Sequence, residues 1–293
     1  MIFGGHCSGG VKKALDHATG IGADAVQLFV QSPRAWRFPD HDPASLEAFC
    51  ARREESGIES VLVHALYLVN LASPNDEFYE KSVSTMRSTV DAACAIRADA
   101  VVFHVGSHLG SGLDAALARV VPALEQVLDR CSDTTWLLME NSAGAGGTIG
   151  RSIDELGILF DALDGHPRLG ICLDTCHLFV SGYDVRDRET LDLVLERVDG
   201  LMGLDRLRAL HVNDSKAPVG SNRDRHENIG DGLIGEDLGV FLSHPLLQGL
   251  PAVAEVPGQS GNGPDADEMR KLREIHARWT AKPARRARAK AAG

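Results

Sequence analysis

Short apolar runs rich in β-branched residues recur along the chain, and longer stretches of mixed polarity separate them. Continuous apolar runs of this length are typical of strands that are buried on both faces, as in a parallel sheet. The pattern predicts eight strands, over residues 2–6, 25–29, 60–64, 100–104, 136–140, 169–174, 207–212 and 252–256.

Each predicted strand is followed by a stretch with the amphipathic spacing of a helix. The predicted helices cover residues 12–20, 45–57, 77–97, 113–130, 152–165, 189–204, 234–244 and 265–279. Strands that alternate with helices form βαβ units around a parallel sheet. Eight units in 293 residues correspond to about 37 residues each, which favours a (β/α)8 TIM barrel over an open doubly wound sheet.

We therefore expect an α/β fold with one TIM-barrel domain over residues 1–277. Residues 278–293 carry six basic and no acidic side chains, and we expect a basic, disordered tail there. A nucleic-acid-binding arm is the alternative for this segment.

The whole chain is acidic, with 41 acidic and 30 basic residues and a formal net charge of −11. This balance argues mildly against a nucleic-acid partner, although net charge sums over surfaces that never meet. The chain shows no secretory signal and no membrane-spanning run. Its six cysteines are then expected to be reduced thiols of a cytoplasmic protein.

Imidazole and carboxylate side chains stand at the carboxyl ends of six predicted strands. In a parallel barrel these ends meet on one face, where such folds keep their chemistry. Unpaired ionised groups are costly to bury, and bound cations remove that cost. The six residues are His64, His104, Glu140, Asp174, His211 and Glu255.

Three further candidates lie in predicted loops, namely His177, Asp224 and His226. Nine candidate ligands exceed the four of a single site and suit two or three ions. A set of nitrogen and oxygen donors favours Zn²⁺, with Mn²⁺ or Fe²⁺ as alternatives. We interpret Cys176, within the same DTCH segment, as a buried apolar thiol and not as a ligand.

The chain resembles a known family, the zinc-dependent apurinic/apyrimidinic endonucleases of the endonuclease IV type. The resemblance runs from about residue 2 to residue 277. The most specific segments are LDTCH and DRHENIG, with FHVGSH somewhat less so. Other matching segments are GGHCSGG, QSPRAWR, HALYLVNLASP, MENSAGAGGTIG, HVNDSK and AEVPG.

The resemblance implies a trinuclear zinc cluster, with Mn²⁺ acceptable at one position. His64, His104 and Glu140 resemble the ligands of one zinc. The second set is Glu140, Asp174, His211 and Glu255, with Glu140 as the bridge. His177, Asp224 and His226 resemble the ligands of the third zinc. Zinc lowers the pKa of bound water to about 7, and Glu140 is implied to help position the resulting nucleophile.

The resemblance also implies hydrolysis of the phosphodiester 5′ to abasic sites, which leaves a 3′-hydroxyl and a 5′-deoxyribose phosphate. Removal of 3′-blocking groups is a second implied activity. Arg34, Tyr67 and Leu68 match positions that insert or stack at the lesion. Additional phosphate contacts are expected from Arg37, Lys216, Arg223 and Arg225. The implied partner is double-stranded DNA with abasic or 3′-blocked sites, and we expect a monomer, associated with the nucleoid when acting on DNA.

Two segments depart from the family pattern, at Ala65–Leu66 and at the EVPG ending of the last strand. Neither changes a ligand, but both concern groups that orient ligands.

The alternative function is a sugar isomerase or epimerase of the same barrel superfamily with one or two divalent ions. A DNA-binding module without catalysis is a third class, and the dense ligand set argues against it.

Overall fold

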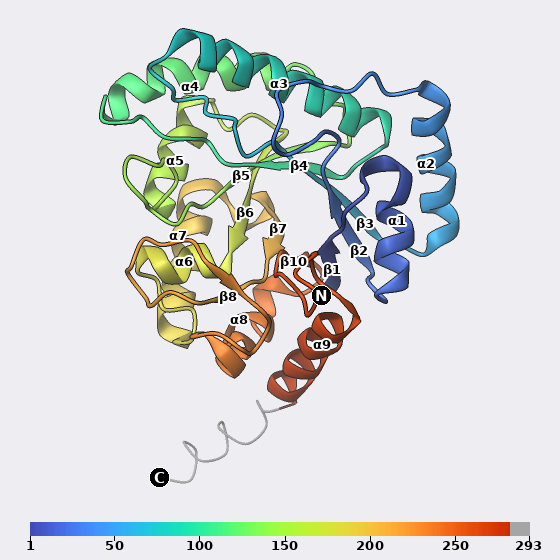
Figure 1. Cartoon of the computed structure of the whole chain (residues 1–293). Helices are drawn as coiled ribbons and strands as arrows, with labels where there is room; N and C mark the ends of the chain where they lie inside the picture. The colour runs from blue at the N-terminus through green and yellow to red at the C-terminus, as the bar shows by residue number, and fades with distance from the viewer. Residues whose placement is uncertain (282–293) are drawn as a thin grey trace.

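Eight parallel strands close into a barrel in this computed structural model, which describes residues 1–281 (Figure 1). The strand order around the barrel is β1-β10-β7-β6-β5-β4-β3-β2. The strands are β1 (Ile2–His6), β2 (Ala25–Leu28), β3 (Ser60–His64), β4 (Ala100–Phe103), β5 (Trp136–Glu140), β6 (Leu169–Asp174), β7 (Leu207–His211) and β10 (Pro251–Ala254). The predicted TIM barrel is confirmed.

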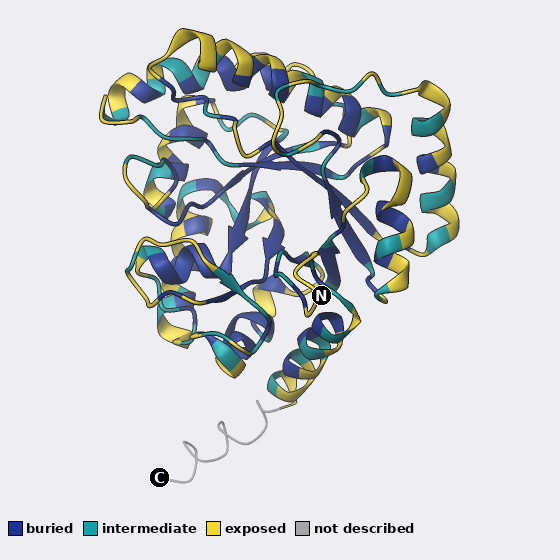
Figure 2. Ribbon diagram, in the orientation of Figure 1, coloured by how far each residue is buried: buried dark blue, intermediate teal, exposed yellow. Residues whose placement is uncertain are grey.

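The apolar runs form strands because both of their faces are covered. One cluster of small and branched side chains, which includes Ala25, Leu62 and Val253, fills the space inside the barrel. A larger cluster packs the outer faces of the strands against the helices. Figure 2 accordingly shows the strands buried and the helices exposed only on their outer sides.

The helices that cover the barrel follow the predicted amphipathic stretches. Their bounds are α1 (Gly10–Gly20), α2 (Pro43–Ser56), α3 (Asp76–Ala95), α4 (Leu113–Leu128), α5 (Ile153–Ala162), α7 (Arg188–Met202), α8 (Leu238–Leu242) and α9 (Ala266–Thr280). Short 3₁₀ helices span η1 (Leu204–Arg206), η2 (Gly235–Asp237) and η3 (Pro245–Leu247). No helix among residues 1–281 is long and apolar enough to cross a membrane.

A helix and a small sheet near the candidate ligands were not predicted from the sequence. Helix α6 (Thr175–Ser181) follows β6 directly, so the expectation that His177 lies in a loop is wrong. A two-stranded antiparallel sheet pairs β8 (Asp214–Ser215) with β9 (His226–Glu227). His226 therefore lies in a short strand, whereas Asp224 lies in a loop as expected.

Helix α9 extends three residues beyond the predicted domain boundary, because Arg278 continues its last turn and Thr280 ends it. The Arg278 guanidinium lies 2.8 Å from the Glu236 carboxylate, which ties this end of α9 to η2. The remainder of the predicted basic tail, residues 282–293, lies outside the described residues.

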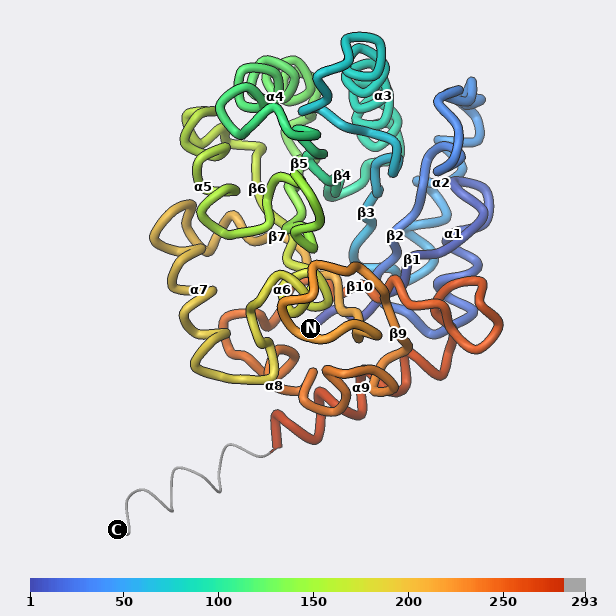
Figure 3. The backbone as a smooth tube through the Cα atoms, turned by 60° about the vertical axis from the view of Figure 1, so that its left-hand side comes forward, coloured from blue at the N-terminus to red at the C-terminus, as the bar shows by residue number. Residues whose placement is uncertain are grey.

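Hydrogen bonds connect the loops at the carboxyl ends of neighbouring strands, the mouth of the barrel. Asn70 binds both the backbone N–H and the carbonyl of Ser107, each at 2.9 Å. Ile149 donates to the carbonyl of Gly106 at 2.9 Å, and the Asn222 amide donates to Ala143 at 3.0 Å. The loops after β3, β4, β5 and β7 therefore support one another around the mouth, where Figure 3 shows them gathered over the strand ends.

Candidate metal centre

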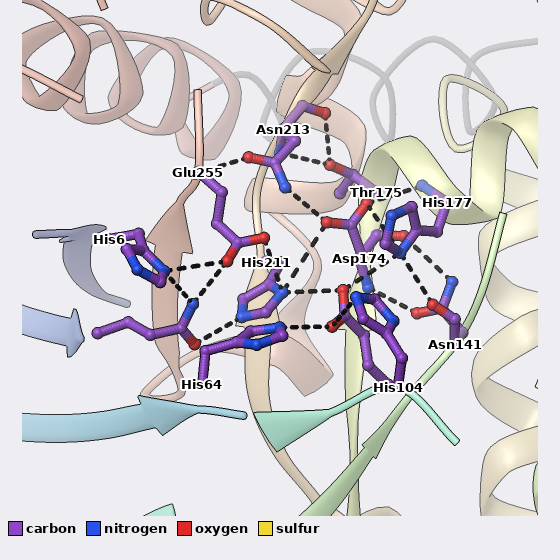
Figure 4. Close-up of polar contacts among 12 residues, drawn as sticks. His6, His64, His104, Asn141, Asp174, Thr175, His177, His211, Asn213 and Glu255 are labelled. Atoms are coloured by element: carbon purple, nitrogen blue, oxygen red, sulfur yellow. Dashed lines mark hydrogen bonds and ion pairs between the residues drawn. The ribbon is translucent and has the colours of Figure 1, made fainter. Parts of the chain in front are cut away.

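The six strand-end side chains meet at the mouth of the barrel. His64, Glu140, Asp174 and His211 are each the last residue of a strand, whereas His104 and Glu255 follow the last residues of β4 and β10. Because the strands are parallel, their carboxyl ends lie at one face of the barrel and bring these side chains together (Figure 4). His64, Glu140, Asp174 and His211 are buried, and the other two are partly exposed.

The carboxylate of Glu140 stands at the centre of four imidazoles. Its two oxygens divide the imidazoles between them, so one carboxylate can serve two neighbouring ions. Oε2 lies 3.3 Å from His64 Nε2 and 3.5 Å from His104 Nε2. Oε1 lies 3.0 Å from His211 Nδ1 and 3.2 Å from His177 Nδ1.

Two more carboxylates complete a second set of donors around His211. Its Nδ1 atom lies 3.3 Å from Glu255 Oε2 and 3.9 Å from Asp174 Oδ2. Single ligand atoms of Glu140, Asp174, His211 and Glu255 all lie within 4.8 Å of one another, and the same holds for His64, His104 and Glu140. These two sets match the first two predicted ligand groups.

The third set joins α6 to the loop that precedes β9. Asp224 Oδ2 lies 3.3 Å from His177 Nε2, and its Oδ1 lies 3.1 Å from His226 Nε2. Asp174 also lies within 4.8 Å of both imidazoles. Asp174 therefore lies close to the donors of both the second and the third set. Glu140 is shared in the same way by the first and the second set.

Local folding explains why His177 turns toward the cluster. Asp174 is the N-cap of α6, and its Oδ1 atom accepts the backbone N–H of His177 at 2.7 Å. A capping carboxylate stabilises the first turn of a helix. The side chain of His177 is thereby fixed one turn above the end of β6, and its ring nitrogens face Glu140 and Asp224.

The electrostatics of the cluster favour added positive charge. Burial alone would lower the pKa of His177, but Asp174, Asp224 and Glu140 raise that pKa well above its ordinary value. Burial would raise the pKa of Glu140, but His104 and His211 hold it well below the usual range. A site that stabilises the ionised form of a buried carboxylate and attracts protons to its imidazoles also suits a cation.

The donor set fits divalent metal ions. Nine oxygen- or nitrogen-bearing side chains converge, and His226 Nε2 is buried without a hydrogen-bond partner although two carboxylates lie within 4.0 Å of it. Cys176 lies within 4.8 Å of Asp224 and His226. Burial raises the pKa of the Cys176 thiol to about 12, which disfavours the thiolate that a metal ligand requires.

Several buried groups orient the candidate ligands, and the sequence analysis did not single them out. Asn213 Nδ2 donates to Asp174 Oδ2 at 2.5 Å, and its Oδ1 accepts the N–H of Glu255 at 2.7 Å. Asn141 Oδ1 accepts the N–H of Asp174 at 2.7 Å. Both asparagines sit beside predicted ligands in matched segments, MENSAG and HVNDSK, and this adjacency was the available signal.

The departure from the family pattern at Ala65 leaves the orientation of His64 intact. The backbone carbonyl of Ala65 accepts a hydrogen bond from His64 Nδ1 at 2.7 Å. This bond leaves Nε2 to face Glu140. A main-chain group thus fixes the ring, and the side chain at position 65 is not needed for that purpose.

The predicted DNA-contact residues are all exposed to solvent in part or in full. Arg34, Arg37, Lys216, Arg223 and Arg225 are exposed. The aromatic side chain of Tyr67 and the apolar side chain of Leu68 have exposed fractions of 59% and 41%. Lys216 is partly balanced by Glu227, at 3.7 Å.

A cavity of about 830 Å³ opens beside the cluster. Its wall includes His6 and Glu255 from the cluster side and Arg34 and Tyr67 from the predicted recognition loops. The Tyr67 ring centroid lies 5.7 Å from that of His64. Arg34 and Tyr67 therefore face the same space as the candidate ligand Glu255.

Comparison with known proteins places the chain in a class. The family profile described as xylose isomerase-like TIM barrel matches residues 15–277. Together with the closed parallel barrel and the donors at its strand ends, this match makes the chain a xylose isomerase-like TIM barrel with a candidate metal centre.

Closer relatives define the family within this class. The chain is 39% identical over 276 residues to "Probable endonuclease 4" of Halothermothrix orenii, covering 93% of this chain and 99% of that protein. It is 40% identical over 283 residues to "Probable endonuclease 4" of Streptomyces avermitilis, covering 92% and 90%. The crystal structure of endonuclease IV from Thermus thermophilus matches with a TM-score of 0.82 and 35% identity, covering 94% and 98%. The chain belongs to the endonuclease IV family and is a metal-dependent nuclease.

Sugar-epimerase structures share the barrel but not a close sequence. A D-tagatose 3-epimerase-like protein matches with a TM-score of 0.69 and 18% identity, covering 95% of this chain and 97% of that one. At this identity the likeness shows the common fold alone. The comparisons therefore favour the nuclease over the isomerase or epimerase alternative.

Proposed function

We propose that this chain hydrolyses the phosphodiester bond 5′ to an abasic site in double-stranded DNA, leaving a 3′-hydroxyl and a 5′-deoxyribose phosphate. The observation that carries the proposal is one mouth that combines nine candidate metal-ligand side chains with exposed Tyr67 and Leu68. A sugar isomerase needs neither the third ligand set nor an exposed aromatic and apolar pair beside it.

The proposed cofactor is Zn²⁺, three ions per chain, with Mn²⁺ acceptable at one position. Three sets of side chains would hold them. The first is His64, His104 and Glu140, the second Glu140, Asp174, His211 and Glu255, and the third His177, Asp224 and His226. The close approach of the donors within each set supports this assignment, as does the nitrogen and oxygen chemistry that Zn²⁺ accepts.

The bound ions would supply a low pKa for water and charge neutralisation for the phosphate oxygens. The chain's own groups would do the positioning. Glu140, the proposed catalytic residue, presents one oxygen to His64 and His104 and the other to His211 and His177. It is therefore placed to help position the attacking nucleophile while keeping the imidazoles oriented.

Recognition of the lesion would come from the loops around the mouth. An abasic site leaves a gap in the base stack, and a protein that flips the nucleotide fills that gap with its own side chains. Tyr67 and Leu68 are exposed for this role, and Arg34 lines the adjoining cavity. Arg37, Lys216, Arg223 and Arg225 would contact backbone phosphates without reading sequence.

The same cluster would also remove blocking groups from 3′ ends, because that reaction again cleaves a phosphate ester at a 3′ oxygen.

We propose that the protein acts as a monomer in the cytoplasm, on nucleoid DNA. Its acidic total does not oppose this, since three divalent ions (+6) against four ligand carboxylates (−4) leave the mouth at +2.

The proposal is tested with a duplex labelled on one strand and carrying a single tetrahydrofuran residue. The zinc-loaded protein should release a fragment with a 3′-hydroxyl that a DNA polymerase extends directly. An intact duplex of the same sequence is the control. The proposal fails if the duplex is not cut while a ketose such as D-fructose is epimerised or isomerised.

A further inference from the structure

A single glutamine interrupts the apolar strand β2 and lies fully buried. Gln27 has an exposed fraction of 0% and sits between Val26 and Leu28, which are equally buried. A buried amide needs hydrogen-bond partners, because an unpaired one costs about 1–3 kcal/mol. Its partners identify what the amide does.

The Gln27 side chain connects three residues of the cluster region. Its Nε2 atom donates to Glu255 Oε1 at 2.6 Å and lies 2.9 Å from His6 Nδ1. Its Oε1 atom lies 2.8 Å from His211 Nε2. Figure 4 shows His6, Glu255 and His211 grouped on this side of the cluster.

The short contact with Glu255 fixes which way the amide points. A carboxylate oxygen accepts hydrogen bonds but cannot donate them when ionised. Only the NH₂ end of Gln27 can therefore face Glu255 Oε1, and the carbonyl end must face His211. Because the carbonyl oxygen only accepts, His211 Nε2 carries the proton in this bond.

This arrangement fixes the other ring nitrogen of His211. With Nε2 protonated and bound to Gln27, the neutral ring has its lone pair on Nδ1. Nδ1 faces Glu140 Oε1 at 3.0 Å and Glu255 Oε2 at 3.3 Å. A lone pair among carboxylate oxygens is unfavourable unless a metal ion or a second ring proton lies between them, and a bound metal ion takes this place directly.

We propose that Gln27 is a positioning residue for the ion held by Glu140, Asp174, His211 and Glu255. It presents Nδ1 of His211 to that ion and holds Oε1 of Glu255, leaving Oε2 turned to the cluster. The inference rests on the proposed metal centre and names a residue that governs one of its sites. Partners of this kind typically change metal affinity about 10–100-fold when they are removed.

The contacts of the Gln27 amide also reach the cavity, through His6. Gln27 Nε2 lies 2.9 Å from His6 Nδ1, and both nitrogens lie beside Glu255 Oε1, at 2.6 Å and 3.3 Å respectively. His6 lines the cavity of about 830 Å³ beside the cluster. Gln27 thus connects His211, Glu255 and the cavity-lining His6, and it sets the ring tautomer of His211.

The test measures binding of Zn²⁺ alone, by competition with a chromophoric chelator, and uses no DNA. Gln27→Met keeps the side-chain length and removes all three contacts. Gln31→Met is the matched control, because Gln31 follows the same strand, has an exposed fraction of only 7%, and donates to the Ala35 carbonyl away from the ligands. Should Gln27→Met not fold, Gln27→Leu is measured in its place.

Gln27→Met should lower the affinity for one of the three ions about 10–100-fold. The affinities for the other two ions should stay unchanged. Gln31→Met should bind all three as the wild type does, and both metal-free variants should unfold at similar denaturant concentrations. Unchanged affinity in Gln27→Met, or an equal loss in Gln31→Met, would overturn the proposal. Because no substrate is present, failure of the wild type to cut abasic DNA is a separate result that bears only on the proposed function.

Discussion

Oε1 of Glu140 lies 3.0 Å from Nδ1 of His211, although the two residues are 71 positions apart in the sequence. They end β5 and β7, and β6 separates those strands in the barrel. Both side chains are fully buried. The contact therefore passes over the end of β6, and together with the contacts to His64, His104 and His177 it makes Glu140 the group on which the imidazoles converge.

Glu140→Gln should abolish incision of abasic DNA and lower the zinc content. The amide keeps the shape but loses the charge that faces four imidazoles. We expect a rate loss greater than about 100-fold, since even indirect partners of a metal are worth 10–100-fold. Incision rate and zinc per chain are measured together, and exposed Glu54→Gln on α2 is the control. Full zinc content and full rate in Glu140→Gln would remove this residue from the site.

Tyr67→Ala should weaken binding to a duplex with an abasic site without changing the zinc content. Stacking of a base on an aromatic ring contributes about 1–3 kcal/mol, which corresponds to roughly a 5–150-fold loss of affinity. Affinity is measured by fluorescence anisotropy on abasic and intact duplexes. Leu246→Ala, an exposed residue in η3 before β10, should leave both affinities unchanged. Equal affinities for Tyr67→Ala and wild type would mean that this loop does not recognise the lesion.

Arg223→Ala should reduce the salt dependence of DNA binding. Each phosphate contact contributes about 0.9 to the slope of log K against log salt for duplex DNA. Loss of one contact should lower the magnitude of the slope by about one, on abasic and intact duplexes alike. Lys81→Ala, on α3 and paired with Glu77, should not alter the slope. A slope unchanged in Arg223→Ala would place this guanidinium outside the DNA interface.

Asp214→Asn should destabilise the fold. The buried carboxylate of Asp214 accepts four backbone N–H groups, those of Ser215, Gly232, Ile234 and Gly235, at 2.7 to 3.0 Å. An amide can accept only on its oxygen, so two N–H groups lose their partner, at about 1–3 kcal/mol each.

The expected loss of unfolding free energy is therefore roughly 2–6 kcal/mol, measured by urea denaturation. The control is Asp231→Asn, in the loop that Asp214 holds but bound at the surface to Lys271 at 2.9 Å, and it should change stability by less than about 1 kcal/mol. Comparable losses in the two variants would show that the buried carboxylate does not hold this loop.

Removal of divalent ions should lower the stability of the wild type. Ions that bind only the folded chain stabilise it by about 2.7 kcal/mol each when free ion is at 100 times Kd. The urea midpoint should fall when a chelator is added and return with excess Zn²⁺. A midpoint that does not respond to the chelator would argue against ions bound in the buried cluster.

The barrel could be predicted because its strands are unbroken apolar runs and its helices are amphipathic. Helix α6 could not be predicted from the mostly apolar segment CHLFVS after β6. In so short a segment, periodicity does not distinguish a buried helix from a loop or a strand. The N-cap Asp174 and the left-handed Gly182 at the other end mark that helix in the structure. Propensity alone does not assign a seven-residue helix, whose stability comes from tertiary packing.

The candidate ligands could be predicted because strand ends share one face, but the groups that orient them could not. Asn141 and Asn213 act through contacts with Asp174 and Glu255 that join different strands. Gln27 did carry a signal, as the polar residue in the apolar run AVQLF, yet its three partners come from β1, β7 and the segment after β10. Such partners depend on the register of the barrel, which the sequence pattern does not specify.

The central claim is that the strand-end cluster cuts DNA at abasic sites. It is tested most directly by comparing zinc-loaded wild type and Glu140→Gln on a duplex with one tetrahydrofuran residue and one labelled 5′ end. The account predicts a single shorter labelled fragment from the wild type, ending at the bond 5′ to the lesion, and none from the variant. No fragment from the wild type, or an equal amount from both proteins, would contradict it.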